Sequence, residues 1–151
     1  MSNYPCIGID LGTTFSALAV INAAGRPEII PNSDGERTTR SAIYFPDEGP
    51  VVVGQLATRN AGSYPEKVVQ WIKRNIGDPD WRFSVDGKSY SAIDLSAIIL
   101  KKIKRDAEAR LGAVRYAVVT VPAYFDETRR TATMKAAELA GLEVLEIINE
   151  P

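Results

Sequence analysis

The sequence contains no histidine and only one cysteine, Cys6. An intrachain disulfide, a zinc site built from cysteine and histidine, and a hydrolase with a Ser-His-Asp or Cys-His catalytic group are therefore excluded for this chain. Cys6 falls at the start of an alternating strand pattern, so we predict a small core residue here rather than a reactive thiol.

Neither sign of charge is in excess, since 18 Lys and Arg residues face 19 Asp and Glu residues. This balance gives no electrostatic basis for binding nucleic acid or a membrane surface. The basic cluster over 101–105 adjoins Asp106 and Glu108, so we expect a solvated helix face. The sequence also lacks a hydrophobic run of membrane-spanning length, and its first residues lack the features of a signal peptide. We therefore predict a cytoplasmic protein without nucleic-acid or membrane partners.

The pattern along the chain is mixed α/β, and the 151 residues suffice for one domain with a hydrophobic core. Apolar runs predict strands over 7–11, 15–22, 28–31, 41–45, 51–54, 115–122 and 142–148. A polar loop is predicted over 32–39, and a hairpin over 81–90 that turns at Asp86-Gly87.

Three helices are predicted, over 63–77, 91–112 and 126–140. Each begins at a capping residue and carries an apolar stripe. For the first helix, Ser63 and Glu66 form the capping box, and the stripe consists of Val68, Val69, Ile72 and Ile76. The order of strands first, then helix, strand, helix and strand is typical of a ribonuclease-H-like unit.

The most informative local motif lies between the first two predicted strands. Gly12 allows the backbone to approach an anion closely, and Thr13 and Thr14 offer backbone and hydroxyl donors to a phosphate chain. Asp10 adds a carboxylate that could hold a hydrated Mg²⁺ or K⁺ ion against the phosphates. These residues alone leave open a tight hairpin whose polar side chains only satisfy the turn.

Six sequence blocks, in order, resemble the DnaK-type heat-shock protein 70 chaperone family. They are DLGTT (10–14), NSDGERTT (32–39), VGQ (53–55), WIKR (71–74), VTVPAYF (119–125) and IINEP (147–151). The resemblance runs from Cys6 to the last residue and corresponds to the N-terminal part of the ATPase domain. It implies the first lobe of a ribonuclease-H-like, actin-like ATPase, with a smaller α+β subdomain inserted at about 31–112. We therefore expect a fragment that lacks the second lobe and the peptide-binding domain.

The resemblance implies a chaperone in which ATP turnover controls the binding and release of unfolded peptide. The implied cofactors are ATP or ADP and Mg²⁺, with K⁺ as a further cation, and the isolated fragment is expected to be inactive. The implied partners are unfolded clients, a J-domain cochaperone and a nucleotide exchange factor. Two alternatives share the superfold: a sugar or acid kinase, which the VPAYF and IINEP blocks disfavour, and an actin-like filament protein switched by nucleotide.

Site residues follow from the resemblance one by one. It implies that Lys73, Glu150 and Asp10 act in catalysis, and that Asp10 and Glu150 hold the metal through its water shell. From the residues alone, Lys73 would be a solvated helix residue and Glu150 a strand-end carboxylate. Nucleotide binding falls to Gly12, Thr13, Thr14 and Phe15, and signalling between domains to Pro122 and Arg130.

Two positions depart from the family pattern. Arg40 stands where members usually carry a proline after the paired threonines. Glu146 stands beside the IINEP block, where the family often has an arginine that meets the J-domain cochaperone. The reversed charge puts ordinary J-domain docking in doubt, because a like-charge contact lowers affinity and association rate.

Overall fold

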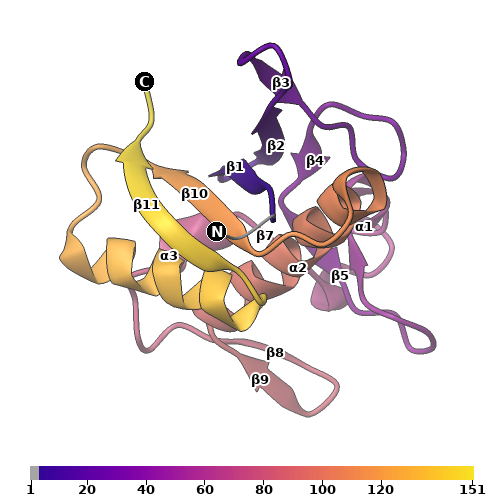
Figure 1. Ribbon diagram of the computed structural model, residues 1–151. Coiled ribbons are helices and arrows are strands. Elements are labelled where there is room, and N and C mark those ends of the chain that lie inside the picture. Colours follow the sequence, from indigo (N-terminus) through magenta and orange to yellow (C-terminus); the bar gives the residue numbers. More distant parts are fainter. Residues whose placement is uncertain (1–3) are drawn as a thin grey trace.

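The computed structural model describes residues 4–151 and is built around a six-stranded sheet (Figure 1). The strand order is β11-β10-β1-β2-β3, and β4 pairs with β2 beside β3. These strands are β1 (Cys6–Leu11), β2 (Phe15–Ile21), β3 (Pro27–Ile29), β4 (Thr39–Arg40), β10 (Tyr116–Val121) and β11 (Glu143–Asn149).

Strands β1, β10 and β11 run parallel to one another, whereas β2 is antiparallel to β1. In the register, Asp10 lies opposite Thr120, and Val121 lies opposite Asn149. The carboxyl ends of all three parallel strands therefore meet at one edge of the sheet. This edge is where open α/β sheets bind their ligands.

Helices α2 (Ala92–Leu111) and α3 (Glu127–Leu139) cover one face of the sheet (Figure 1). The alternation of β1 explains why, because Ile7, Ile9 and Leu11 all point to this side and are buried. The capping predictions for these two helices are confirmed: Ser91 and Asp94 form a capping box for α2, and Asp126 caps α3. Among residues 4–151, no helix packs on the opposite side, which we call the open face (Figure 1).

The segment between β4 and α2 forms a second, smaller group of elements. A three-stranded sheet of order β6-β5-β7 lies next to α1, and a separate hairpin pairs β8 with β9. The hairpin turns at Asp86 and Gly87, both at positive φ, as the sequence predicted. The bounds are β5 (Ala42–Tyr44), β6 (Val52–Val53), α1 (Gln55–Arg59), β7 (Val68–Gln70), β8 (Phe83–Val85) and β9 (Lys88–Tyr90).

The predicted helix over 63–77 is wrong. The segment instead contains a 3₁₀ turn, η1 (Pro65–Lys67), the strand β7, and a second 3₁₀ turn, η2 (Ile72–Asn75). Neighbouring valines Val68 and Val69 pair with Tyr44 and Ile43 of β5, so the backbone groups of β5 find partners that a helix would not supply. The short apolar run over 68–76 is compatible with the spacing of a helix or of a strand. The pairing with β5 makes 68–70 a strand.

Two smaller expectations are also corrected. Cys6 is exposed, because it shares the open face with Gly8 and Asp10 rather than the core. Partial burial nevertheless raises the pKa of the Cys6 thiol, which disfavours a reactive thiolate. The short helix α1 was not predicted at all.

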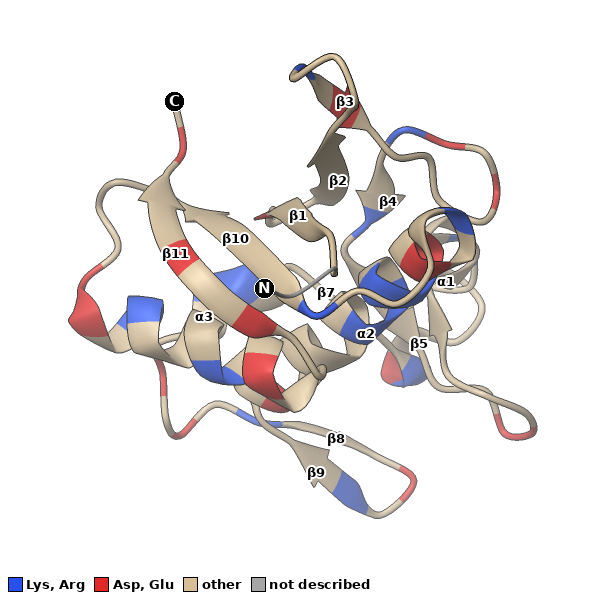
Figure 2. Ribbon diagram, in the orientation of Figure 1, with Lys and Arg blue, Asp and Glu red and all other residues tan. Residues whose placement is uncertain are grey.

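Charge is mixed along the described chain, and Figure 2 shows acidic and basic residues interspersed on α3. Lys67 carries the best-defined surface ion pairs, with Nζ 2.5 Å from Asp47 and 2.9 Å from Asp86. Hydrogen bonds to these two carboxylates raise the pKa of Lys67. Within residues 4–151, no helix is long and apolar enough to cross a lipid bilayer.

Candidate functional site

The first part of the site is the end of β1, where Asp10 points to the open face. Its Oδ1 accepts a 3.1 Å hydrogen bond from the Thr120 hydroxyl on the neighbouring strand β10. Asp10 is otherwise exposed. The strand register thus places one exposed carboxylate at the edge of the sheet where the parallel strands end.

The loop from Gly12 to Thr14 joins β1 to β2 beside this carboxylate. A Cβ atom added to Gly12 would lie 2.1 Å from the Phe15 carbonyl oxygen, so only glycine fits this turn. The loop is fixed from outside, since the Ser41 backbone N–H donates to the Thr14 carbonyl oxygen at 2.9 Å. Thr14 and Phe15 themselves are exposed. A short, fixed loop with free donors is suited to bind an anion.

Lys73 and Glu150, which are both predicted to act in catalysis, are in contact although they lie 77 residues apart in the sequence. Lys73 Nζ lies 2.7 Å from Glu150 Oε1, and the two side chains are 11% and 31% exposed. Glu150 is placed by the sheet, because its backbone N–H donates to the Val121 carbonyl oxygen and extends the β10–β11 ladder. Trp71 directs Lys73, since its left-handed backbone (φ 55°) turns the chain from β7 into η2.

Pro122 and Arg130, the predicted signalling residues, are linked through one turn. The Phe125 N–H donates to the Pro122 carbonyl oxygen, and Arg130 Nε donates to the Phe125 carbonyl oxygen at 2.9 Å. Arg130 Nη2 also donates to Asn149 Oδ1 at 2.8 Å, one residue before Glu150. Arg130 therefore connects the loop after β10 to the end of β11, which Glu150 follows.

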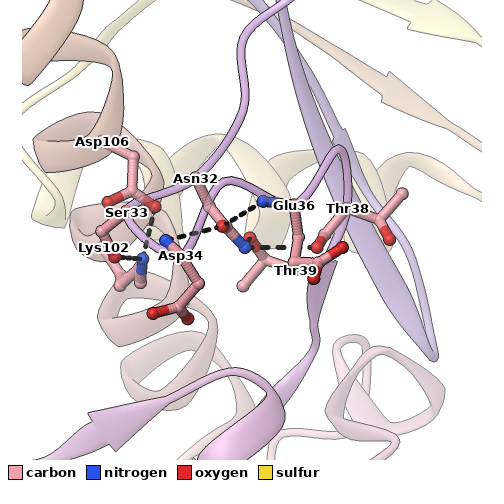
Figure 3. A network of polar contacts seen from close by, with 8 residues as sticks. All are labelled: Asn32, Ser33, Asp34, Glu36, Thr38, Thr39, Lys102 and Asp106. Atoms are coloured by element: carbon pink, nitrogen blue, oxygen red, sulfur yellow. Dashed lines mark hydrogen bonds and ion pairs between the residues drawn. The ribbon is translucent and has the colours of Figure 1, made fainter.

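The loop over 32–39 is held in shape by Asn32 and attached to α2 by Lys102 (Figure 3). Asn32 Oδ1 accepts from the backbone N–H groups of Asp34 and Glu36, and its Nδ2 donates to Thr39 Oγ1 at 3.0 Å. This network fixes the start of β4. It thereby also fixes Ser41, whose backbone N–H contacts the loop from Gly12 to Thr14.

The basic cluster is solvated at Lys101 and Arg105, as expected, but Lys102 departs from this prediction. Lys102 Nζ lies 2.5 Å from Asp106 Oδ2 and 2.9 Å from Ser33 Oγ, with the Lys102 and Asp106 side chains only 12% and 8% exposed. The pair therefore supports the loop rather than facing water.

The donor set fits a magnesium ion that is bound mainly through its substrate. In the described part of the chain, no cluster of three or more acidic or cysteine side chains could hold a metal by itself. Asp10 near the end of β1 and Glu150 just after β11 each present a carboxylate at the same edge of the sheet, with β10 between the two strands. Mg²⁺ commonly binds one or two carboxylates and keeps several waters while phosphates supply the remaining oxygens. These two residues meet that requirement.

Sequence reasoning missed Thr120, Asn149 and Trp71. The hydroxyl of Thr120 and the amide of Asn149 become site residues only through the parallel register of β10 with its neighbours. Trp71 lay inside the predicted helix, which hid its turn. In the described chain, no hydrogen bond or ion pair joins Asp10 to the Lys73–Glu150 pair, so the predicted site consists of two separate groups at one sheet edge.

A comparison with protein families gives a match that runs from residue 6 to residue 151. The family model described as "Hsp70 protein" matches residues 6–84 and 78–151. The two matches together span the six-stranded sheet, the helices α1, α2 and α3, and every predicted site residue.

Proposed function

The chain belongs to the Hsp70 family, and from this premise we propose that the carboxyl edge of its six-stranded sheet binds Mg²⁺–ATP and positions it for hydrolysis. The chain is the nucleotide-binding lobe of a chaperone, and neither the kinase nor the filament alternative is favoured. The observation that carries the proposal is the 2.7 Å contact between Lys73 and Glu150 at the strand ends.

Each residue group has a distinct role in the proposed reaction. The backbone N–H groups of the loop from Gly12 to Thr14, and that of Phe15 directly after it, bind phosphate oxygens. Asp10 and Glu150 hold the water shell of Mg²⁺, and the ion neutralises phosphate charge when bound. Lys73 offers a compact charge that stabilises the transferring phosphate and orients the attacking water. Phosphoryl transfer needs this positioning and charge neutralisation more than covalent chemistry.

The remaining proposals follow from family membership. We propose an actin-like fold for the complete domain, with residues 31–112 as its outer subdomain and K⁺ as a second cation. Pro122 and Arg130 carry nucleotide state toward a peptide-binding domain, because Arg130 contacts both the Pro122 turn and Asn149. Unfolded peptides, a J-domain protein and an exchange factor are the proposed partners, in the cytoplasm and under stress.

Nucleotide binding by the full-length protein tests the proposed function. Calorimetry should show ATP and ADP binding that depends on Mg²⁺, and ATP should accelerate release of a bound unfolded peptide. The 151-residue chain alone should bind ATP weakly and turn it over negligibly, because it offers one wall of the cleft. Absence of ATP binding by the full-length protein would contradict the proposal, and micromolar affinity of the isolated chain would contradict its second part.

Exchanging Glu146 for arginine should improve cooperation with a generic J-domain protein. Glu146 is exposed on β11, the outermost strand of the sheet, where an acidic J-domain loop would meet like charge. We expect J-domain stimulation of steady-state ATPase activity to rise in Glu146→Arg, and the gain to shrink at high salt. Glu138→Arg on α3 makes the same charge change at another exposed site. Equal stimulation of wild type and Glu146→Arg at both salt levels would show that this position does not set cochaperone choice.

A further inference from the structure

Arg40 lies beside the loop that the proposed function assigns to phosphate binding. In the β2–β4 pairing it stands directly opposite Phe15, the residue that follows the loop. Its guanidinium carbon lies 4.3 Å from the centre of the Phe15 ring, a stacked cation–π arrangement. The next residue, Ser41, donates its backbone N–H to Thr14. The arginine is thus one residue from a direct contact with the loop.

The guanidinium of Arg40 has no hydrogen-bond or ion-pair partner among residues 4–151. Its Nε atom is buried without a hydrogen bond, and no described residue forms an ion pair with it. A guanidinium carries five N–H donors, and stacking on a ring satisfies none of them. Buried polar groups in proteins are nearly always hydrogen-bonded, and an unpaired charge costs more than a neutral group. An anion that reaches the partly buried guanidinium would supply the acceptor that Nε lacks.

The face on which Arg40 lies indicates which anion this is. Directly opposed residues in an antiparallel pair point to the same side, so Arg40 and Phe15 share a face. Phe15 and Ala17 are two residues apart on one strand, and Ala17 lies opposite Asp10. Arg40 and Asp10 therefore flank the same loop on the open face.

The support of Arg40 is rigid, which suits a binding residue. The loop that precedes it is tied internally by Asn32 and to α2 by Lys102 (Figure 3). On its other side, the buried hydroxyls of Ser41 and Ser16 are 2.8 Å apart and join β4 to β2. A guanidinium held in this way loses little additional freedom when it binds a ligand.

We propose that Arg40 is a further nucleotide-binding residue, which donates charge-assisted hydrogen bonds to the phosphate chain. This inference rests on the proposed function, because ATP supplies the anion. Arginine is well matched to phosphate, since its planar fork binds two oxygens at once. Proline, the usual family residue here, offers no such donors, so the contact distinguishes this chain.

Nucleotide affinity of Arg40 variants in the full-length protein tests the proposal. We expect Arg40→Gln to raise the Kd of ATP and ADP by about tenfold, as loss of a charged hydrogen bond does. Adenosine affinity should be unchanged. The salt dependence of ATP binding should also weaken, because one phosphate contact is lost. Arg26→Gln, at an exposed arginine in the β2–β3 turn, is the matched control and should bind like wild type.

The outcomes separate this proposal from the proposed function. Wild-type protein that does not bind ATP would contradict the function itself. Wild-type binding with an unaltered Kd in Arg40→Gln would overturn only the role of Arg40, as would an equal loss for ATP and adenosine, which would indicate a role in folding or stacking. If melting curves show that Arg40→Gln is unfolded, Arg40→Lys decides. Lysine keeps the positive charge but lacks the planar guanidinium, so this variant should bind ATP a few-fold more weakly and adenosine with unchanged affinity.

Discussion

Lys73→Ala in the full-length protein is expected to slow single-turnover ATP hydrolysis by about 10²–10³-fold, the usual cost of removing one positioned group that stabilises transition-state charge. Nucleotide affinity should change far less, because the phosphate loop and Asp10 remain. The physical reason is placement: the Lys73 ammonium is mostly buried, is paired with Glu150, and lies 5.6 Å from the centre of the Phe125 ring. Rapid mixing of enzyme in excess over ATP measures the chemical step directly.

Lys135→Ala provides the matched control for this experiment. Lys135 is exposed on α3 and loses the same charge without touching the site. It should hydrolyse ATP at the wild-type rate. If Lys73→Ala did so as well, Lys73 would be a surface residue whose ion pair has only a structural effect.

Gly12→Ala is expected to give the largest loss of stability and of ATP affinity together. The new methyl group would lie 2.1 Å from the Phe15 carbonyl oxygen, and a backbone atom cannot move aside as the end of a side chain can. Forcing atoms into a filled space costs about 1–3 kcal/mol of unfolding free energy. The loop must shift to relieve the clash, so we expect ATP affinity to fall at least about tenfold, which corresponds to about 1.4 kcal/mol. Thermal melting and calorimetry measure the two effects.

Gly8→Ala, in the strand β1 that leads into the loop, is the control. A Cβ there would lie 3.9 Å from the Ala19 carbonyl oxygen, an ordinary contact, so melting temperature and affinity should stay close to wild type. An unchanged melting temperature and an unchanged ATP affinity in Gly12→Ala would mean that the loop accommodates a Cβ atom and that its tight geometry is not required.

Features with a local physical cause were predictable from the sequence. The capping box of Ser91 and Asp94 marks the start of α2, and the Asp86-Gly87 pair fixes the hairpin turn. The helix prediction for 63–77 was wrong because the apolar spacing of this segment suits a helix, whereas its partner strand β5 lies elsewhere in the sequence. No pattern within the segment itself reports that partner.

The same division applies to the site. Asp10 and Gly12 belong to one short motif that suggests phosphate binding, but the motif alone left open a tight hairpin, and the family resemblance decided between the two. Lys73 and Glu150 were identified by family resemblance, because taken alone a lysine or a glutamate has no distinguishing chemistry. Arg40 was visible only as a departure from the family pattern. Its stacking on Phe15 depends on a strand pairing that the sequence did not show.

The long sequence separations in the site have a consequence for how the protein is made. Asp10 and Thr120 are 110 residues apart, and Lys73 and Glu150 are 77 apart. At a synthesis rate of about 5–20 residues per second, the ribosome needs roughly 5–20 s between adding the first residue of the former pair and its partner. During that time one edge of β1 has no neighbouring strand and is open to pairing with other chains. A protein that assists the folding of others therefore passes through an aggregation-prone interval during its own synthesis.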